Sequence, residues 1–349
     1  MSMQEFIAKI AKGPKASKDL TWEEAKRAMK ALIEGDATAA QTGAFLVAMR
    51  FKMESVTELA SFTAAARSYV APLSIPQNVG VVDVPSYAGK RDTFHALAGA
   101  AILAASAGGA VLMHGYDGIP GRAGNAAVLK AMGIAIDLDG RNVAHMVTKH
   151  GFGYLDIALY HPPLYRFLEM RQELGVRSVF HPIARLLNPA RASSQVIGLT
   201  HPPHFEKTAE AIRMLGMPRA LVVRGVEGDP ELSIAMATKV LELRDERITP
   251  LMLAPKDAGL PMGTSREMAG YAPEQREKEA DLLKRILHNQ VRGAQRDWVL
   301  INAGFLLYAA GKGVSLADCT MLARRALEQG DGANKLDALT QMPMFAAKS

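Results

Sequence analysis

Apolar side chains recur at intervals of three and four residues in the N-terminal part of the chain, which is the spacing of one helix face. Ala25, Met29, Leu32 and Ile33 follow this spacing, and Gly35 comes where such a helix should end. The pattern predicts an amphipathic helix, and the polar residues between these positions would face water.

Two more helices are expected before the pattern changes at Pro72. One runs from about residue 39 to 52. The other begins at Ser55, because Ser55 and Glu58 have the spacing of a capping box, in which each side chain hydrogen-bonds the backbone N–H of the other residue. The first seventy or so residues therefore read as a helical unit.

Short apolar runs alternate with helical segments in the rest of the chain. These runs have the length and the β-branched composition of buried strands. The expected strands are 79–84, 110–113, 134–138, 195–199 and 220–223. The expected helices are 94–107, 123–132, 209–215, 273–287 and 298–310, with a mostly helical C-terminal third. Such alternation predicts a mainly parallel sheet with helices on both faces.

These patterns predict an α/β protein with two unequal domains. Residues 1–74, together with a returning helical segment of about 164–192, are expected to form a small helical domain that mediates dimerisation. Residues 75–163 and 193–345 are expected to form the larger α/β domain.

Composition adds several limits. The chain has 349 residues, of which 49% are apolar and 22% are charged, so a large buried core is expected. The single cysteine, Cys319, excludes an internal disulfide and a thiolate metal cluster. No apolar run has the length of a secretory or membrane-spanning segment, so we expect a cytoplasmic protein without a membrane partner. The net charge of +6 favours polyanionic partners by its sign, although many proteins are mildly basic.

Four blocks of sequence carry a more specific signal. They are LTWEEAKRAMKALIEGDATAAQTGAFLVAMRFKMES, RAGNAAVLKAMG, HPPLYRFLEMRQELGVRSVFHPIARLLNPA and LINAGFLLYAAGKGVSL. In this order they resemble the anthranilate phosphoribosyltransferase family, also called glycosyltransferase family 3. The resemblance implies the anthranilate phosphoribosyltransferase fold, a small α-helical domain with a larger α/β domain, and the family's usual homodimer.

The phosphate-binding loop departs from the family. Members carry GTGGDG after the first strand, because glycines let backbone N–H groups approach the diphosphate of phosphoribosyl pyrophosphate. Here the loop reads DVPSYAGKRDTFH. Pro85 has no N–H to donate, and Tyr87 adds bulk. Lys90, Arg91 and Thr93 remain as side chains that can hold an anion.

Two further family motifs are altered. KHGNR becomes MHGYD, which keeps His114 and loses both cations. A lone histidine of this kind is more often a packed loop residue than a catalytic one. The Mg²⁺ motif DGLDE becomes EGDPE, in which Pro230 replaces a paired aspartate and Glu231 remains as a weak metal ligand. We therefore expect no catalytic residue and no metal site, and Mg²⁺ only if the chain still transfers a phosphoribosyl group.

One family feature persists. Arg171 matches the arginine that contacts the carboxylate of anthranilate, and it serves either this role or an ion pair. Arg122 is the remaining candidate for anion binding. A retained fold with altered motifs resembles the divergent YbiB-like branch of the family, which is regarded as lacking the tryptophan-pathway activity and is associated with nucleic-acid binding.

Cations gather in two segments of the sequence. The middle segment contains few acids, whereas the C-terminal one has acids nearby and is equally well read as a solvated helix face. The candidate nucleic-acid contacts are Arg166, Arg177, Arg185, Arg191, Lys284, Arg285 and Arg292. Tyr160, Tyr165 and Phe180 lie among the middle cations, and aromatic rings can stack on unpaired bases.

We therefore expect a homodimer that has lost anthranilate phosphoribosyltransferase activity and binds single-stranded DNA or RNA without sequence specificity. The alternative is a Mg²⁺-dependent phosphoribosyltransferase that acts on another acceptor. A true anthranilate enzyme is the least favoured of the three. Salt-dependent binding of a single strand would support the nucleic-acid-binding hypothesis. Binding of phosphoribosyl pyrophosphate would support the phosphoribosyltransferase.

Overall fold

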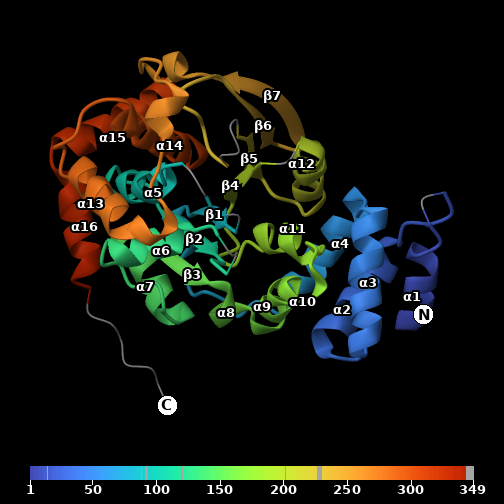
Figure 1. Ribbon diagram of the computed structural model, residues 1–349. Helices are drawn as coiled ribbons and strands as arrows, with labels where there is room; N and C mark the ends of the chain where they lie inside the picture. The colour runs from blue at the N-terminus through green and yellow to red at the C-terminus, as the bar shows by residue number, and fades with distance from the viewer. Residues whose placement is uncertain are drawn as a thin grey trace.

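The computed structural model of the protein describes residues 1–13, 15–87, 89–90, 93–118, 121–200, 202–225 and 230–342. A group of N-terminal helices lies beside a larger unit in which helices surround a sheet (Figure 1). The expected fold class, a small helical part and a larger α/β part with a mainly parallel sheet, is confirmed. None of the helices in the described ranges is long and apolar enough to cross a membrane.

The N-terminal helices begin and end where local sequence signals predict. They are α1 (Met3–Ile10), α2 (Trp22–Glu34), α3 (Ala39–Lys52) and α4 (Val56–Arg67). A capping box of Thr21 and Glu24 starts α2, and the predicted box of Ser55 and Glu58 starts α4. Gly35 ends α2 with a φ of 82°, a conformation that glycine adopts without strain. These signals act within a few residues, which is why the sequence reveals them.

One seven-stranded sheet forms the centre of the larger unit, with the strand order β3-β2-β1-β4-β5-β6-β7. The strands are β1 (Val82–Ser86), β2 (Val111–Gly115), β3 (Phe152–Asp156), β4 (Ser194–Leu199), β5 (Arg219–Arg224), β6 (Thr238–Arg244) and β7 (Arg247–Leu253). The strands from β3 to β5 in this order are parallel, whereas β6 and β7 pair antiparallel. The sheet is therefore mainly parallel, as expected.

The chain leaves the middle of this sheet in two directions. From β1 it passes through α5 (Ala96–Ser106) to β2, and from β4 it passes through α12 (Phe205–Met214) to β5. Because such crossovers are right-handed, opposite directions place the two helices on opposite faces. Helix α14 (Ala294–Ala309) packs against α5, and α12 lies on the other side (Figure 1). The neighbouring strands β1 and β4 thus mark the topological switch point.

The remaining helices cover the sheet and connect it to the N-terminal group. They are α6 (Asn125–Ala131), α7 (Gly140–His150), α8 (Ile157–Tyr160), α9 (Pro162–Glu169), α10 (Arg171–Leu174), α11 (Phe180–Arg185), α13 (Arg276–Leu287), α15 (Leu316–Glu328) and α16 (Asp331–Thr340). Helix α11 packs on α4, and the Arg67 guanidinium donates two hydrogen bonds of 2.6 and 3.0 Å to the carbonyl of Leu186. Residues near 186 therefore reach back to the N-terminal helices.

Two secondary-structure predictions were wrong. Residues 134–138 form no strand, although Ile134, Ile136 and Leu138 are buried; they lead into α7, and the third strand of this half is β3. The C-terminal third also contains the hairpin of β6 and β7 in addition to helices. Asp245 and Glu246 both have positive φ at its turn, which matches the twist of a tight hairpin. An Asp-Glu pair rarely adopts this conformation, so the turn gave little signal.

Candidate functional site

The carboxyl ends of β1 and β4 form the crevice where folds of this kind commonly bind ligands. The ladder between the two strands extends only over Val82 and Asp83, opposite Ser194 and Gln195. Further along β1, Pro85 has no N–H with which to continue it. The cavity that opens there has a volume of about 30 Å³, which is room for about one or two water molecules. The switch point is present, but its crevice is nearly full.

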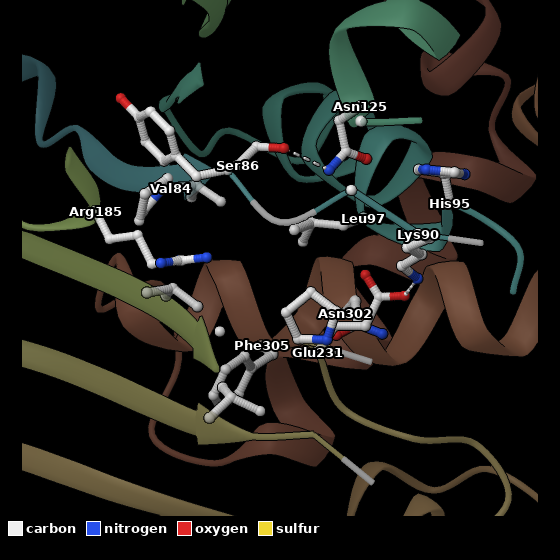
Figure 2. A pocket seen from close by; sticks show the side chains of 18 residues that line it. Val84, Ser86, Lys90, His95, Leu97, Asn125, Arg185, Glu231, Asn302 and Phe305 are labelled. Atoms are coloured by element: carbon white, nitrogen blue, oxygen red, sulfur yellow. Dashed lines mark hydrogen bonds and ion pairs between the residues drawn. The ribbon is translucent and has the colours of Figure 1, made fainter. Parts of the chain in front are cut away.

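A buried ion pair lines one side of this crevice (Figure 2). Lys90 pairs with Glu231, and these side chains are 5% and 1% exposed. The Lys90 ammonium also donates to the carbonyl of Phe94 at 2.8 Å and lies 4.6 Å from the ring centre of Trp298. From the sequence we expected Lys90 to hold an anion and Glu231 to be a weak metal ligand. The structure instead places the two charges against each other.

A second buried network surrounds His114. The hydroxyl of Tyr87 lies 2.9 Å from His114 Nδ1 and 2.7 Å from the hydroxyl of Tyr160. His114 Nε2 lies 3.2 Å from the carboxylate of Asp83, which accepts a further hydrogen bond of 2.7 Å from Gln195. Burial raises the pKa of both tyrosines well above the usual range. Each of these side chains has at least one protein partner, whereas Asp83 Oδ1 and Gln195 Oε1 are buried without a hydrogen-bond partner among the described residues. The surviving histidine is therefore a packed residue.

His95 is fixed in the same way. Its Nε2 lies 2.9 Å from the carbonyl of Ala123, and its Nδ1 lies 2.8 Å from Glu279, which also pairs with Arg276. Burial acts to raise the pKa of Glu279, but hydrogen bonds from His95 and the charge of Arg276 lower it below the ordinary value of 4.5. The carboxylate is therefore ionised and holds α13 against the start of α5.

Two residues of the altered phosphate and Mg²⁺ motifs, Lys90 and Glu231, pair with each other. In the described ranges, no group of three or more His, Cys, Asp or Glu side chains is placed to hold a metal ion by itself. Arg91, Glu227 and Asp229 lie outside the described residues.

Thr93 and Arg122 belong to the segments that border the crevice. Thr93 forms an isolated β-bridge with Ala269, and Arg122 donates a hydrogen bond of 3.3 Å to the carbonyl of Gly89. Both are half-buried, so their side chains still reach the surface. The arginine also faces a group of other cations.

We call this group the arginine cluster; it consists of Arg50, Arg122, Arg171, Arg177 and Arg185. Burial lowers the pKa of Arg177, and the charges of Arg171, Arg122 and Arg50 lower it further. Burial and then the charge of Arg177 lower the pKa of Arg185 to about 10. Guanidinium groups from four parts of the chain are therefore close enough to repel one another.

Acidic partners are scarce around this cluster. Arg50, Arg171, Arg177 and Arg185 form no ion pair with any residue that the structure describes. One guanidinium nitrogen of Arg171 is buried there without a hydrogen-bond acceptor. Like charges held together without carboxylates create a strong positive potential, which attracts anions. Of these residues, Arg50 was missed in the sequence because only the fold brings α3 to the middle segment.

The other candidate cations lie at the surface. Arg166, Arg191, Arg285 and Arg292 are exposed, and Lys284 is half-buried. Within the described ranges, the expected pairing of the C-terminal cations with neighbouring acids is absent, and Arg292 hydrogen-bonds Asn289 instead. These cations remain available to solvent and its ions.

The expected stacking surface for bases was mostly wrong. Tyr160 is 4% exposed and Phe180 is fully buried, with its ring stacked on Phe167 at a centroid distance of 4.1 Å. Tyr165 is half-buried and packs edge-on against Tyr116. Two of the three aromatic rings are therefore parts of the core and cannot stack on a base.

Comparison with known proteins identifies the family. The helical bundle domain of the glycosyl transferase family matches residues 4–70, and the a/b domain of that family matches residues 78–333. The anthranilate phosphoribosyltransferase of Haloarcula marismortui is 36% identical over 97% of this chain and 99% of its own length. That of Haloferax volcanii is 36% identical over 97% of this chain and 100% of its own length.

Solved structures agree with this result. The anthranilate phosphoribosyltransferase of Thermus thermophilus has a TM-score of 0.85 at 31% identity and covers 97% of this chain and 98% of its own. The Saccharomyces cerevisiae enzyme in complex with PRPP and Mg has a TM-score of 0.83 at 18% identity, over 97% and 96% of the two chains, which is a likeness of fold. The chain therefore belongs to glycosyltransferase family 3, the anthranilate phosphoribosyltransferase family.

Proposed function

We propose that this member of the family binds single-stranded nucleic acid without sequence specificity and does not make phosphoribosylanthranilate. This places it with the YbiB-like branch that its altered motifs resemble. We also propose that it acts as a homodimer, because two copies would double the basic surface. Light scattering of the purified protein would give twice the mass of one chain; a monomer would contradict this part.

The arginine cluster is the observation that carries the proposal. Four of its members have no carboxylate partner among the described residues, so their charge is available to an external anion. Contacts to phosphate groups supply affinity for any sequence, because every nucleotide carries the same charge. The surface cations Arg166 and Arg191 extend this potential beyond the cluster.

The crevice supports the loss of the family reaction. A ligand as large as phosphoribosyl pyrophosphate does not enter a cavity of about 30 Å³. Binding at these side chains would also have to break the ion pair of Lys90 and Glu231. The altered loop sequence and the small volume of the crevice are thus two separate arguments against the synthesis of phosphoribosylanthranilate.

The test is a salt titration of a labelled single-stranded oligonucleotide, followed by fluorescence anisotropy. Affinity should fall with a log–log slope of about −0.7 for each phosphate that is neutralised. Arg177→Ala should weaken binding and reduce the size of the slope by about 0.7. Arg213→Ala is the charge-matched control, because Arg213 pairs with Glu210 on the surface of α12. Binding that is independent of salt, or equal effects of the two variants, would refute the proposal.

A second candidate is a Mg²⁺-dependent phosphoribosyltransferase that acts on another acceptor. It is favoured by the likeness to anthranilate phosphoribosyltransferases, which extends over 97% of the chain at 36% identity. Calorimetry with phosphoribosyl pyrophosphate and Mg²⁺ tests it: saturable binding supports the enzyme, and its absence supports the first proposal. Growth of a strain that lacks anthranilate phosphoribosyltransferase, on expression of this chain, would reveal the original activity.

A further inference from the structure

A larger cavity lies at α11, apart from the crevice, and we call it the α11 cavity. Its volume is about 400 Å³, which falls within the range of about 300–1,000 Å³ that small-molecule sites occupy. It lies between the end of α3, the segment that contains α11, and the segment from β4 to α12. Among the residues that the structure describes, only Arg185 lines both this cavity and the crevice. Nothing in the family resemblance assigns it a ligand.

The charge in this cavity is positive. Arg50, Arg177 and Arg185 line it, and none of them pairs with an acid that the structure describes. The carboxylate of Glu54 also lines it, but lies 3.3 Å from Lys207 and 3.6 Å from His204, so its charge is already balanced. Arg185 donates one hydrogen bond of 3.0 Å to the carbonyl of His181, and its charge, like that of the other two, is not balanced by a described carboxylate. Three such guanidinium groups match a dianionic phosphate better than a singly charged carboxylate, and their planar donors suit its oxygens.

His181 supplies a neutral acceptor in the same wall. The residue is 6% exposed, and its Nδ1 lies 3.3 Å from the carbonyl of Ser178. Burial and then the charges of Arg185 and Arg177 lower its pKa to about 3. The ring is therefore neutral at physiological pH, with a proton on Nδ1 and a lone pair on Nε2. Nε2 has no hydrogen-bond partner among the described residues, so a ligand hydroxyl or amino group would supply the missing donor.

The rest of the wall is largely apolar. Met53, Val179 and Leu199 line the cavity together with Pro182 and Pro203. Apolar side chains favour a flat ring, and the thioether of methionine makes favourable contacts with aromatic groups. A ligand that suits every part of the wall has a phosphate, a hydroxyl or amino donor and a planar ring.

We propose that the α11 cavity binds a nucleoside monophosphate unit, with its phosphate on the arginines, a donor group on His181 and its base against the apolar wall. The unit is either a free nucleotide or one nucleotide of a bound strand. This proposal deepens the proposed function. It rests on that function only if the unit is a nucleotide of a bound strand.

Calorimetry with adenosine monophosphate, ribose 5-phosphate and adenosine tests the three parts of the site. Adenosine monophosphate should bind most tightly, because only it carries phosphate, donor and base. Arg177→Ala should weaken its binding about tenfold or more, as expected for a lost charged hydrogen bond. Arg213→Ala removes the same charge from the exposed surface of α12, where Arg213 pairs with Glu210, and should change binding by no more than about twofold. His181→Phe should weaken the binding of adenosine monophosphate more than the binding of inorganic phosphate.

Competition identifies the source and separates this inference from the proposed function. If adenosine monophosphate displaces a labelled oligonucleotide, and a 5′-phosphate on the strand strengthens binding, the cavity holds a nucleotide of the strand. If it binds without displacing the strand, the cavity takes free nucleotides. Strand binding with no uptake of adenosine monophosphate overturns the inference and leaves the proposed function intact. Equal loss in Arg177→Ala and Arg213→Ala also overturns it, because a general charge effect then explains the binding.

Discussion

The ion pair of Lys90 and Glu231 offers the sharpest test of the difference between a packed residue and an anion-binding one. Both side chains are at most 5% exposed. Lys90→Met and Glu231→Leu keep the approximate volume of each side chain and remove one charge at a time. Each single variant leaves the other charge buried and should lower the free energy of unfolding by about 3–5 kcal/mol.

The double variant replaces both charges with apolar groups. It should lie close to the wild-type stability, because well-packed apolar residues often replace a buried pair at no net cost. Urea unfolding followed by circular dichroism gives the four free energies of this cycle. The double variant should also keep its affinity for single-stranded DNA, since Lys90 is not exposed to the strand. Additive losses of stability, or a loss of DNA affinity in the double variant at unchanged stability, would refute the reasoning.

Three further predictions concern stability, again measured by urea unfolding. Tyr87→Phe removes a buried partner of His114 and should cost about 1–3 kcal/mol; no loss would mean that the hydroxyl is not needed. Because the pKa of Glu279 is lowered in the folded state, its ionised form stabilises the protein above the unfolded pKa, and this contribution is lost as the pH falls through the folded pKa. Glu279→Gln should therefore destabilise the protein at pH 7 and flatten the acid side of its pH profile below about 4.5; an unchanged profile would contradict this. Gly304→Ala should cost about 1–3 kcal/mol, because a Cβ at this position would come within 2.2 Å of Thr320 on α15; wild-type stability would show that the two helices can move apart.

Sequence reasoning succeeded where the signal is local. The capping box at Ser55 and Glu58 lies within one helical turn, and it begins α4 as predicted. It failed where tertiary contacts decide. The apolar residues at 134–138 are buried like a strand, yet no neighbouring strand pairs with them. The turn at Asp245 and Glu246 needs an unfavourable backbone conformation that only the completed hairpin stabilises.

The candidate site shows the same division. The loss of the glycine cradle could be read directly, because Pro85 lacks an N–H in any fold. The pairing of Lys90 could not be predicted, because its partner Glu231 lies far away in the sequence and only the fold brings the two side chains together. Similarly, the sequence marked Arg177 and Arg185, but only the fold adds Arg50 to them.

The ion pair of Lys90 and Glu231 in the crevice affects how the stability of this protein depends on ligands in its surroundings. In a ligand-binding member of such a fold, stability at the switch point rises with ligand concentration. Here Lys90 and Glu231 are part of the chain, so their effective concentration at the crevice is fixed by their attachment. Unlike a bound ligand, the two side chains cannot dissociate from the protein. The centre of the sheet therefore contains a buried contact that the chain supplies by itself.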